Sequence, residues 1–252
     1  MPTTLIVGGN GKVARHLTRI LATETRPSHH VHSIIRTSSQ EADIEALGSR
    51  PVVLSIEAAS VAEIANTMGK IAPESVVFLA SAPFAESERA ESIDRDGAIK
   101  CMDACAEAGV KRFIIVSGMD VRDCDKRPIP DWYNEADVKA SARLRGFIDP
   151  WMRAKLAADR ELRVGNSRRK LDYTIVRPGR ITDDAGVGSV FVGKAHLGNS
   201  VSQEDVARVM AACLTNPDTI GLAFDVTGGD LPVAQAVAQV AADRVDSFEG
   251  YY

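Results

Sequence analysis

Short apolar runs alternate along the chain with longer stretches in which apolar residues recur at helical spacing. The short runs predict strands at 5–7, 31–35, 52–55, 76–80, 113–117, 173–176 and 223–226. The periodic stretches predict helices near 12–24, 40–47, 59–70, 88–108, 150–164, 202–214 and 233–243. Strands separated by helices in this way are typical of a parallel sheet that is covered on both faces. We therefore predict an α/β fold built on a doubly wound parallel sheet.

Two irregular segments interrupt this alternation, at about 118–148 and about 180–200. The first is rich in Asp, Arg and Pro, and the second is rich in glycine. Both follow the carboxyl ends of predicted strands, where ligands bind in open α/β sheets. A chain of 252 residues fits one such domain. The prediction is a single domain over 1–252 with two loops on the substrate side.

Composition and charge narrow the classes of function. The chain is 45% hydrophobic and 25% charged, and its formal net charge is −4, with no basic stripe of the kind that binds nucleic acid. No apolar stretch approaches the roughly 20 residues that span a bilayer. The sequence starts on a strand, which leaves no room for a targeting peptide, and it ends soon after the last helix. We expect a cytoplasmic protein, monomeric, with neither a nucleic-acid nor a membrane partner.

No metal site is predicted. The four cysteines do not have metal-ligand spacing, and Cys101 and Cys105 share one face of a predicted helix, as reduced core thiols do. Two other groups of potential ligands lie close together in the sequence: His29, His30 and His32, and Asp120, Asp123 and Asp125. The histidines lack a Cys or Glu to complete a site, and the aspartates lack the glycine and closing glutamate of a calcium loop.

The first predicted strand runs directly into a glycine turn and then a helix. Gly9-x-Gly11-x-x-Ala14 has the spacing G-x-G-x-x-G/A, and Gly8-x-x-Gly11 gives a second register. Residues without a Cβ allow a pyrophosphate to approach the backbone, and the free N–H groups at the positive end of the helix hold the anion. Some tight strand–helix turns have only a structural role, but the apolar strand and the periodic helix supply the context that a dinucleotide site needs. The predicted phosphate-binding residues are Gly8, Gly9, Asn10, Gly11, Lys12 and Val13.

The end of the second strand bears on which coenzyme is bound. NAD-specific sites place an acidic residue there to hold the ribose 2′-hydroxyl, whereas an arginine suits the 2′-phosphate of NADP. This chain has Arg36, Thr37 and Ser38 at that point, with no acid. An arginine at a strand end can also be simply solvated. The missing acid favours NADP, with NAD as the alternative.

Several segments together resemble the atypical short-chain dehydrogenases/reductases, in particular the NmrA-like, NAD(P)-binding group. They are Val-Gly-Gly-Asn-Gly-Lys-Val-Ala at 7–14, Phe-Ile-Ile-Val-Ser at 113–117, Leu-Asp-Tyr-Thr-Ile-Val-Arg-Pro-Gly at 171–179 and Ser-Gln-Glu-Asp-Val-Ala at 202–207. The resemblance implies a Rossmann sheet with NADP across its carboxyl edge. It also implies that Ala80, Ser81 and Pro83 lie beside the coenzyme and that Pro178 and Gly179 line the nicotinamide end.

The resemblance also assigns catalytic positions. In the wider family a Ser, a Tyr and a Lys handle proton transfer, the last two as Tyr-x-x-x-Lys on a helix. The matching residues here are Ser117 and Lys155. The resemblance also implies that both bind the coenzyme, with Ser117 near C4 of the nicotinamide and Lys155 on the hydroxyls of the nicotinamide ribose. Trp151 stands at the tyrosine position, and an indole N–H is no general acid. Tyr133 in the long loop is a candidate replacement, although beside Trp132 it also fits a packing or substrate contact. Ser117 can equally be a serine that simply ends a strand.

Three functions remain open. The first is an NADP-dependent reductase that passes a hydride to a small conjugated or carbonyl acceptor without the tyrosine acid. The second is a non-catalytic NmrA-like sensor that binds NADP and reports through a protein partner, because loss of the acid costs a binding protein little. An epimerase or dehydratase is less favoured, since those reactions usually need the missing tyrosine.

Overall fold

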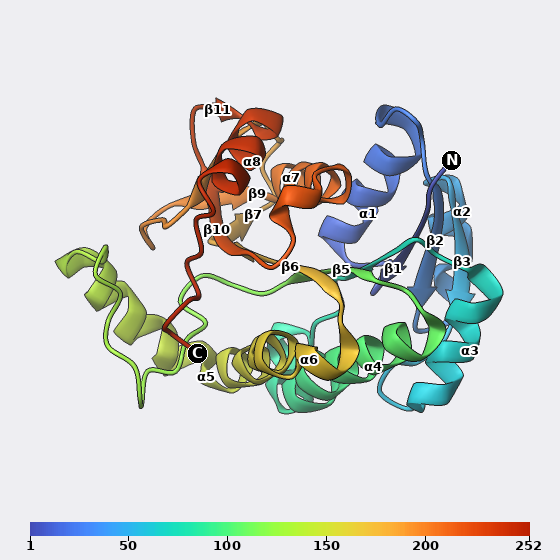
Figure 1. The fold of residues 1–252 in the computed structure, drawn as a ribbon, viewed down its shortest axis with the longest axis horizontal. Coiled ribbons are helices and arrows are strands. Elements are labelled where there is room, and N and C mark those ends of the chain that lie inside the picture. The colour runs from blue at the N-terminus through green and yellow to red at the C-terminus, as the bar shows by residue number, and fades with distance from the viewer.

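The computed structural model describes residues 1–252, except for the side chain of Phe84. A nine-stranded sheet runs through the molecule in the order β11-β8-β10-β6-β5-β4-β1-β2-β3 (Figure 1). Its strands are β1 (Thr3–Val7), β2 (His30–Ile35), β3 (Ser49–Val53), β4 (Ser75–Phe78), β5 (Arg112–Val116), β6 (Asp172–Pro178), β8 (Ser189–Gly193), β10 (Ala223–Gly228) and β11 (Leu231–Pro232). The strands from β3 to β10 pair in parallel, and β8 is antiparallel to both β10 and β11. The direction of winding reverses between β1 and β4, as in a doubly wound Rossmann sheet, so the predicted fold class is confirmed.

Helices cover both faces of this sheet. The α-helices are α1 (Lys12–Arg19), α2 (Glu41–Ala46), α3 (Val61–Ile71), α4 (Ala98–Ala108), α5 (Glu135–Val164), α6 (Asn166–Arg169), α7 (Gln203–Thr215) and α8 (Val233–Ala242). Shorter 3₁₀ or π turns occupy Ile20–Glu24, Ser38–Gln40, Phe84–Arg89, Glu91–Gly97 and Pro217–Thr219. One apolar core lies between the sheet and α3, α4 and α5, and a second lies between the sheet and α1, α7 and α8 (Figure 1). Because both faces are buried, the central strands are continuous apolar runs rather than alternating ones.

The predicted irregular segment at 118–148 is wrong in its second half. Helix α5 begins at Glu135, after Asn134, whose side chain accepts hydrogen bonds from the first turn while Asp137 accepts one from the Asn134 N–H group, at 2.9 Å. The helix bends at Ile148, just before Pro150, which is where we expected it to begin. The buried residues of the first half are polar, Asp137 and Ser141. A helix whose inward face is polar has no apolar periodicity to reveal it.

Two other boundaries also differ from expectation. The third strand ends at Val53 rather than Ser55, so the residues after it belong to the carboxyl edge of the sheet. The glycine-rich segment at 180–200 contains β8 and two short strands, β7 (Arg180–Thr182) and β9 (Ser200–Ser202), which pair with each other. Strands of three residues are too short to show a period in the sequence.

Neither a membrane span nor a metal cluster occurs in the described residues. No helix there is long and apolar enough to cross a bilayer, and no three His, Cys, Asp or Glu side chains converge on a point. Among the histidines, His29 is buried, and its Nδ1 lies 2.8 Å from the Thr4 hydroxyl.

Candidate functional site

The glycine turn is held between β2 and the segment after β4. The N–H groups of Gly8 and Gly9 both donate to the carbonyl of Ile34, at 3.2 and 2.9 Å. Gly8 has φ +84°, and a Cβ there would lie 2.6 Å from Cα of Ala80. A Cβ at Gly9 would lie 2.4 Å from Cβ of Ser33. Gly8 is therefore required by its close contact with the backbone of Ala80, and Gly9 by its close contact with the Ser33 side chain.

Helix α1 presents free backbone donors to the space above this turn. Its N-cap residue, Gly11, provides no side-chain cap, and within the described residues the amides of Lys12 and Val13 form no backbone hydrogen bond. Free N–H groups at the positive end of a helix dipole favour a bound anion. Arg15, one turn into the helix, donates to the Asn10 side chain at 3.0 Å. The turn thus has the features that a pyrophosphate requires.

Beside the turn lies a cavity of about 390 Å³ at the carboxyl ends of β1, β2, β3 and β4. Its lining contains seven of the predicted coenzyme residues: Gly8, Asn10, Gly11, Arg36, Ala80, Ser81 and Pro83. Apolar walls come from Ile34, Ile35, Leu54, Ile56, Leu79 and Ile93. A cavity of this size with apolar walls and a few converging polar groups is typical of a small-molecule site.

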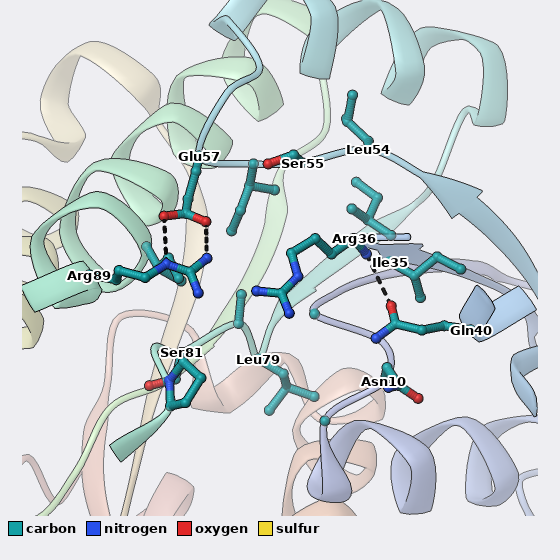
Figure 2. A pocket seen from close by; sticks show the side chains of 17 residues that line it. Asn10, Ile35, Arg36, Gln40, Leu54, Ser55, Glu57, Leu79, Ser81 and Arg89 are labelled. Carbon is teal, nitrogen blue, oxygen red and sulfur yellow. Dashed lines mark hydrogen bonds and ion pairs between the residues drawn. The ribbon is translucent and has the colours of Figure 1, made fainter. Parts of the chain in front are cut away.

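Arg36 projects into this cavity, between Gln40 and the Glu57–Arg89 ion pair (Figure 2). The Arg36 N–H donates to the Gln40 side chain at 3.2 Å. Among the described residues, no carboxylate forms an ion pair with its guanidinium, which leaves that group available to a ligand. Thr37 and Ser38, also predicted, are exposed and lie outside the cavity lining; Thr37 contacts Ser39 instead, at 2.9 Å between the hydroxyls.

The Glu57–Arg89 pair was not predicted from the sequence. The Arg89 guanidinium donates twice to the Glu57 carboxylate, and this contact holds the pKa of Glu57 below its usual value, with Ser92 assisting. Lys100 on α4 fixes the same segment by donating to the carbonyls of Glu57 and Ala59, both at 2.9 Å. The position of Glu57 shortly after the third strand was the one indication in the sequence that it could lie at the site. Its partner Arg89 is 32 residues away along the chain, so the pair could not be predicted.

Lys12 is not among the residues that line this cavity. Its ammonium group lies 2.6 Å from Asp183 in the segment after β7, and both side chains are largely exposed. Gln203 donates to the same carboxylate at 2.5 Å. This exposed contact joins the start of α1 to the start of α7 and adds little stability. The predicted role of Lys12 in coenzyme binding, like that of Val13, stays a prediction.

Asp94 connects the cavity to Lys155. Its carboxylate accepts hydrogen bonds from the Ser81 hydroxyl at 2.5 Å and the Ala82 amide at 2.9 Å, and it lies 3.0 Å from the Lys155 ammonium. Lys155 also approaches the carbonyl of Val116, at 3.4 Å. Asp94 is buried, so the pair fixes Lys155 firmly at the end of β5.

Ser117 follows β5 at the same edge. Its hydroxyl contacts the carboxylate of Asp159, which lies one helical turn beyond Lys155 on α5. Asp159 was not predicted from the sequence, although its spacing of four from Lys155 places both residues on one helix face. Ser117 and Lys155 are thus brought to one edge as the resemblance implied, and each is paired with an aspartate.

Pro178 and Gly179 lie where β6 ends, next to this cluster but outside the cavity lining. The Pro178 carbonyl accepts from the Met119 amide at 3.0 Å, and the Gly179 amide donates to Val226 at 2.9 Å. A Cβ on Gly179 would lie 2.7 Å from the carbonyl oxygen of Asn199. The chain is therefore closely packed here, and contact with the nicotinamide remains a prediction.

The aromatic residues near the site have packing roles. Trp151, one turn before Lys155, packs against the core under α5. Tyr133 stacks edge-on against Trp132, with ring centroids 5.7 Å apart, and its hydroxyl lies 3.4 Å from Asp120. Burial raises the pKa of Tyr133, with Asp120 adding to the effect. Tyr133 therefore fits the packing interpretation better than that of a replacement acid.

Comparison with known proteins gives consistent matches. A family profile described as NAD(P)H-binding matches residues 8–217. The UPF0659 protein C216.03 of Schizosaccharomyces pombe is 36% identical over 239 residues, which is 94% of each chain. A solved structure from Bacillus halodurans, described as a candidate NAD-dependent epimerase/dehydratase, is 32% identical with a TM-score of 0.77, over 95% of this chain and all of that one. A Veillonella parvula short-chain dehydrogenase/reductase, crystallised with NADP, is 17% identical with a TM-score of 0.67, over 92% of this chain and 98% of its own, and shares the fold.

Proposed function

Because the chain belongs to the NAD(P)H-binding family, among the atypical short-chain dehydrogenases/reductases, we propose that it is an NADP-dependent reductase. The hydride acceptor is a small carbonyl or conjugated compound. The observation that carries the proposal is the unpaired Arg36 guanidinium inside the cavity beside the glycine turn. A guanidinium there suits a 2′-phosphate, whereas a carboxylate would repel it.

The groups that would bind the coenzyme and those that would act on the acceptor lie at different points along the carboxyl edge of the sheet. The free amides of α1 receive the pyrophosphate, and Arg36 with Gln40 surrounds the adenosine end. Lys155, fixed by Asp94, and Ser117 occupy the opposite end of this edge, where the acceptor is reduced. The coenzyme, when bound, supplies the hydride, so the protein must position the acceptor and exclude water.

A non-catalytic NADP sensor is the second candidate, and one observation favours it. Trp151 occupies the position of the usual proton donor, and the Tyr133 hydroxyl lies 3.4 Å from Asp120, with its ring edge-on to Trp132. A binding protein tolerates this loss, whereas a carbonyl reductase needs another proton source. The epimerase name of the Bacillus halodurans relative suggests a third activity, but that reaction also usually uses the missing tyrosine.

One experiment separates these candidates. Purified protein is mixed with NADPH and a panel of flavin, quinone and carbonyl acceptors, and the loss of absorbance at 340 nm is followed. Turnover above the background of the free reagents supports the reductase. Tight NADPH binding by titration calorimetry with no turnover on any acceptor overturns the reductase and supports the sensor.

Ser117→Ala is expected to reduce turnover without abolishing coenzyme binding. Loss of the hydroxyl removes a group at the reacting end, so kcat should fall by about tenfold or more. NADPH affinity, measured by calorimetry, should change by less than about threefold, because the adenosine cavity does not include Ser117. An equal loss of affinity and of kcat would show that Ser117 supports the fold of the site and not the reaction.

A further inference from the structure

The proposed reduction of a carbonyl needs a proton donor, and no residue described so far supplies the proton. When a carbonyl carbon receives a hydride, its oxygen must receive a proton. Trp151 has no acidic hydroxyl, and the Tyr133 hydroxyl faces Asp120. The group that contacts Ser117 directly is the carboxyl of Asp159.

The Asp159 carboxyl group is completely buried, and only one of its two oxygens has a hydrogen-bond partner among the described residues. Its Oδ2 contacts the Ser117 hydroxyl, and its Oδ1 has no hydrogen-bond partner among the described residues. A buried carboxylate with one neutral hydrogen-bond donor is costly, so such a group tends to hold its proton. The geometry alone therefore favours a carboxyl group that can donate.

Three cations on two elements surround Asp159. Lys155 and Arg163 lie on α5, and Arg177 lies on β6. Each of these cations has its own aspartate: Asp94 for Lys155 at 3.0 Å, Asp246 for Arg163 at 2.6 Å and Asp225 for Arg177 at 2.9 Å. Burial outweighs the Ser117 contact and these cations, and it raises the pKa of Asp159 to about 6. The group therefore changes its protonation state in the range where enzymes operate.

We propose that Ser117 and Asp159 form a proton relay that supplies the proton for carbonyl reduction, in place of the absent tyrosine. This inference rests on the proposed reductase function. Lys155, on the same face of α5 as Asp159, lies 3.4 Å from the carbonyl of Val116, the residue before Ser117.

With this relay, every proton and electron of the reduction is accounted for. A bound coenzyme would supply the hydride for the new C–H bond at the carbonyl carbon and would itself be oxidised, and the π electrons of the carbonyl would move to its oxygen. The hydroxyl proton of Ser117 passes to that oxygen while the carboxyl proton of Asp159 passes to Ser117 Oγ. Asp159 is left as a carboxylate, which accepts a hydrogen bond from Ser117 and regains its proton through Ser117 from water that replaces the product.

The first test needs no coenzyme. In protein carrying ¹³C-labelled aspartate carboxyls, Asp159→Asn identifies the Asp159 resonance by its disappearance. We expect this carboxyl to titrate near pH 6 in the wild type, and at higher pH in Ser117→Ala because that variant lacks the hydroxyl that stabilises the carboxylate. A midpoint below about 4.5, the ordinary range of the group, would overturn the relay.

The second test measures the reaction with two kinds of acceptor. Asp159→Asn keeps the size of the side chain but cannot supply the proton, so kcat on a carbonyl acceptor should fall by about 10²-fold. In the wild type kcat should fall as the pH rises through 6, since the carboxyl form is the donor, and the variant should lose this dependence. On a quinone, which takes its proton from water, the variant should lose much less of the wild-type rate than on a carbonyl acceptor. Asp172→Asn, an exposed carboxyl at the opposite end of β6, is the matched control and should change neither rate.

The outcomes distinguish this inference from the function on which it rests. If the wild type reduces carbonyls and Asp159→Asn keeps both its rate and its pH profile, the relay is wrong and the reductase stands. Turnover confined to quinones or flavins likewise overturns the relay alone. If the wild type reduces no acceptor at all, the proposed function fails and the relay fails with it, whatever the carboxyl titration shows.

Discussion

Replacing Arg36 with aspartate is expected to weaken the binding of NADP about 100-fold while changing that of NAD by less than about threefold. The guanidinium lies in the cavity beside the glycine turn with no carboxylate partner among the described residues, so a 2′-phosphate would take its charge-assisted hydrogen bonds directly. Aspartate removes these bonds and adds repulsion. Glu57, already in the cavity lining, would then be a second negative charge nearby. NAD lacks the phosphate and loses only a minor contact.

Titration calorimetry with both coenzymes measures this discrimination. Arg50→Asp is the matched control, because Arg50 is an exposed arginine on the neighbouring strand β3, outside the cavity lining. It should leave both affinities within about twofold of wild type. The Arg36 effect should also shrink as salt is raised, since the side chain is exposed to solvent. Equal losses for NADP and NAD, or no loss at all, would show that Arg36 does not read the 2′-phosphate.

The parts of this site that the sequence predicts are those set by local pattern. An apolar strand, a turn without Cβ atoms and an amphipathic helix occupy one continuous stretch, so Gly8 and Gly11 could be placed at the carboxyl edge of a sheet before any coordinates. Arg36 could be placed at the same edge, because parallel strands end at one common edge of the sheet. The cavity contains all three of these residues.

The parts that could not be predicted depend on contacts between distant segments. Glu57 meets Arg89 across 32 residues, and Ser117 meets Asp159 across 42. No period or spacing in a single sequence marks such pairs. The first half of α5 escaped prediction for a related reason. Ser141, on the inner face of the helix, donates a hydrogen bond to the Asp120 carboxylate at 2.6 Å. The helix is therefore held by buried polar contacts, and the polar composition of its sequence is that of a loop.

The glycine turn yields the second large effect, on stability. Gly8→Ala is expected to lower the free energy of unfolding by about 3–4 kcal/mol, of which the left-handed φ contributes about 1 and the steric clash the rest. The clash arises because the new Cβ would lie 2.6 Å from both Cα and N of Ala80, which are backbone atoms and cannot rotate away. The turn can accommodate the methyl group only by separating β1 from the segment after β4. Urea denaturation of the protein without coenzyme measures the loss.

Gly109→Ala is the matched control for this change. Gly109 ends α4 with φ +75°, close to the +84° of Gly8, but a Cβ there would meet nothing within 4 Å. This variant therefore reports the cost of the backbone conformation alone, about 1 kcal/mol. The difference between the two variants isolates the contact between the turn and Ala80. If both variants lose the same stability, the turn is not packed tightly against the segment after β4, and the close packing that we assign to Gly8 does not shape the phosphate-binding backbone.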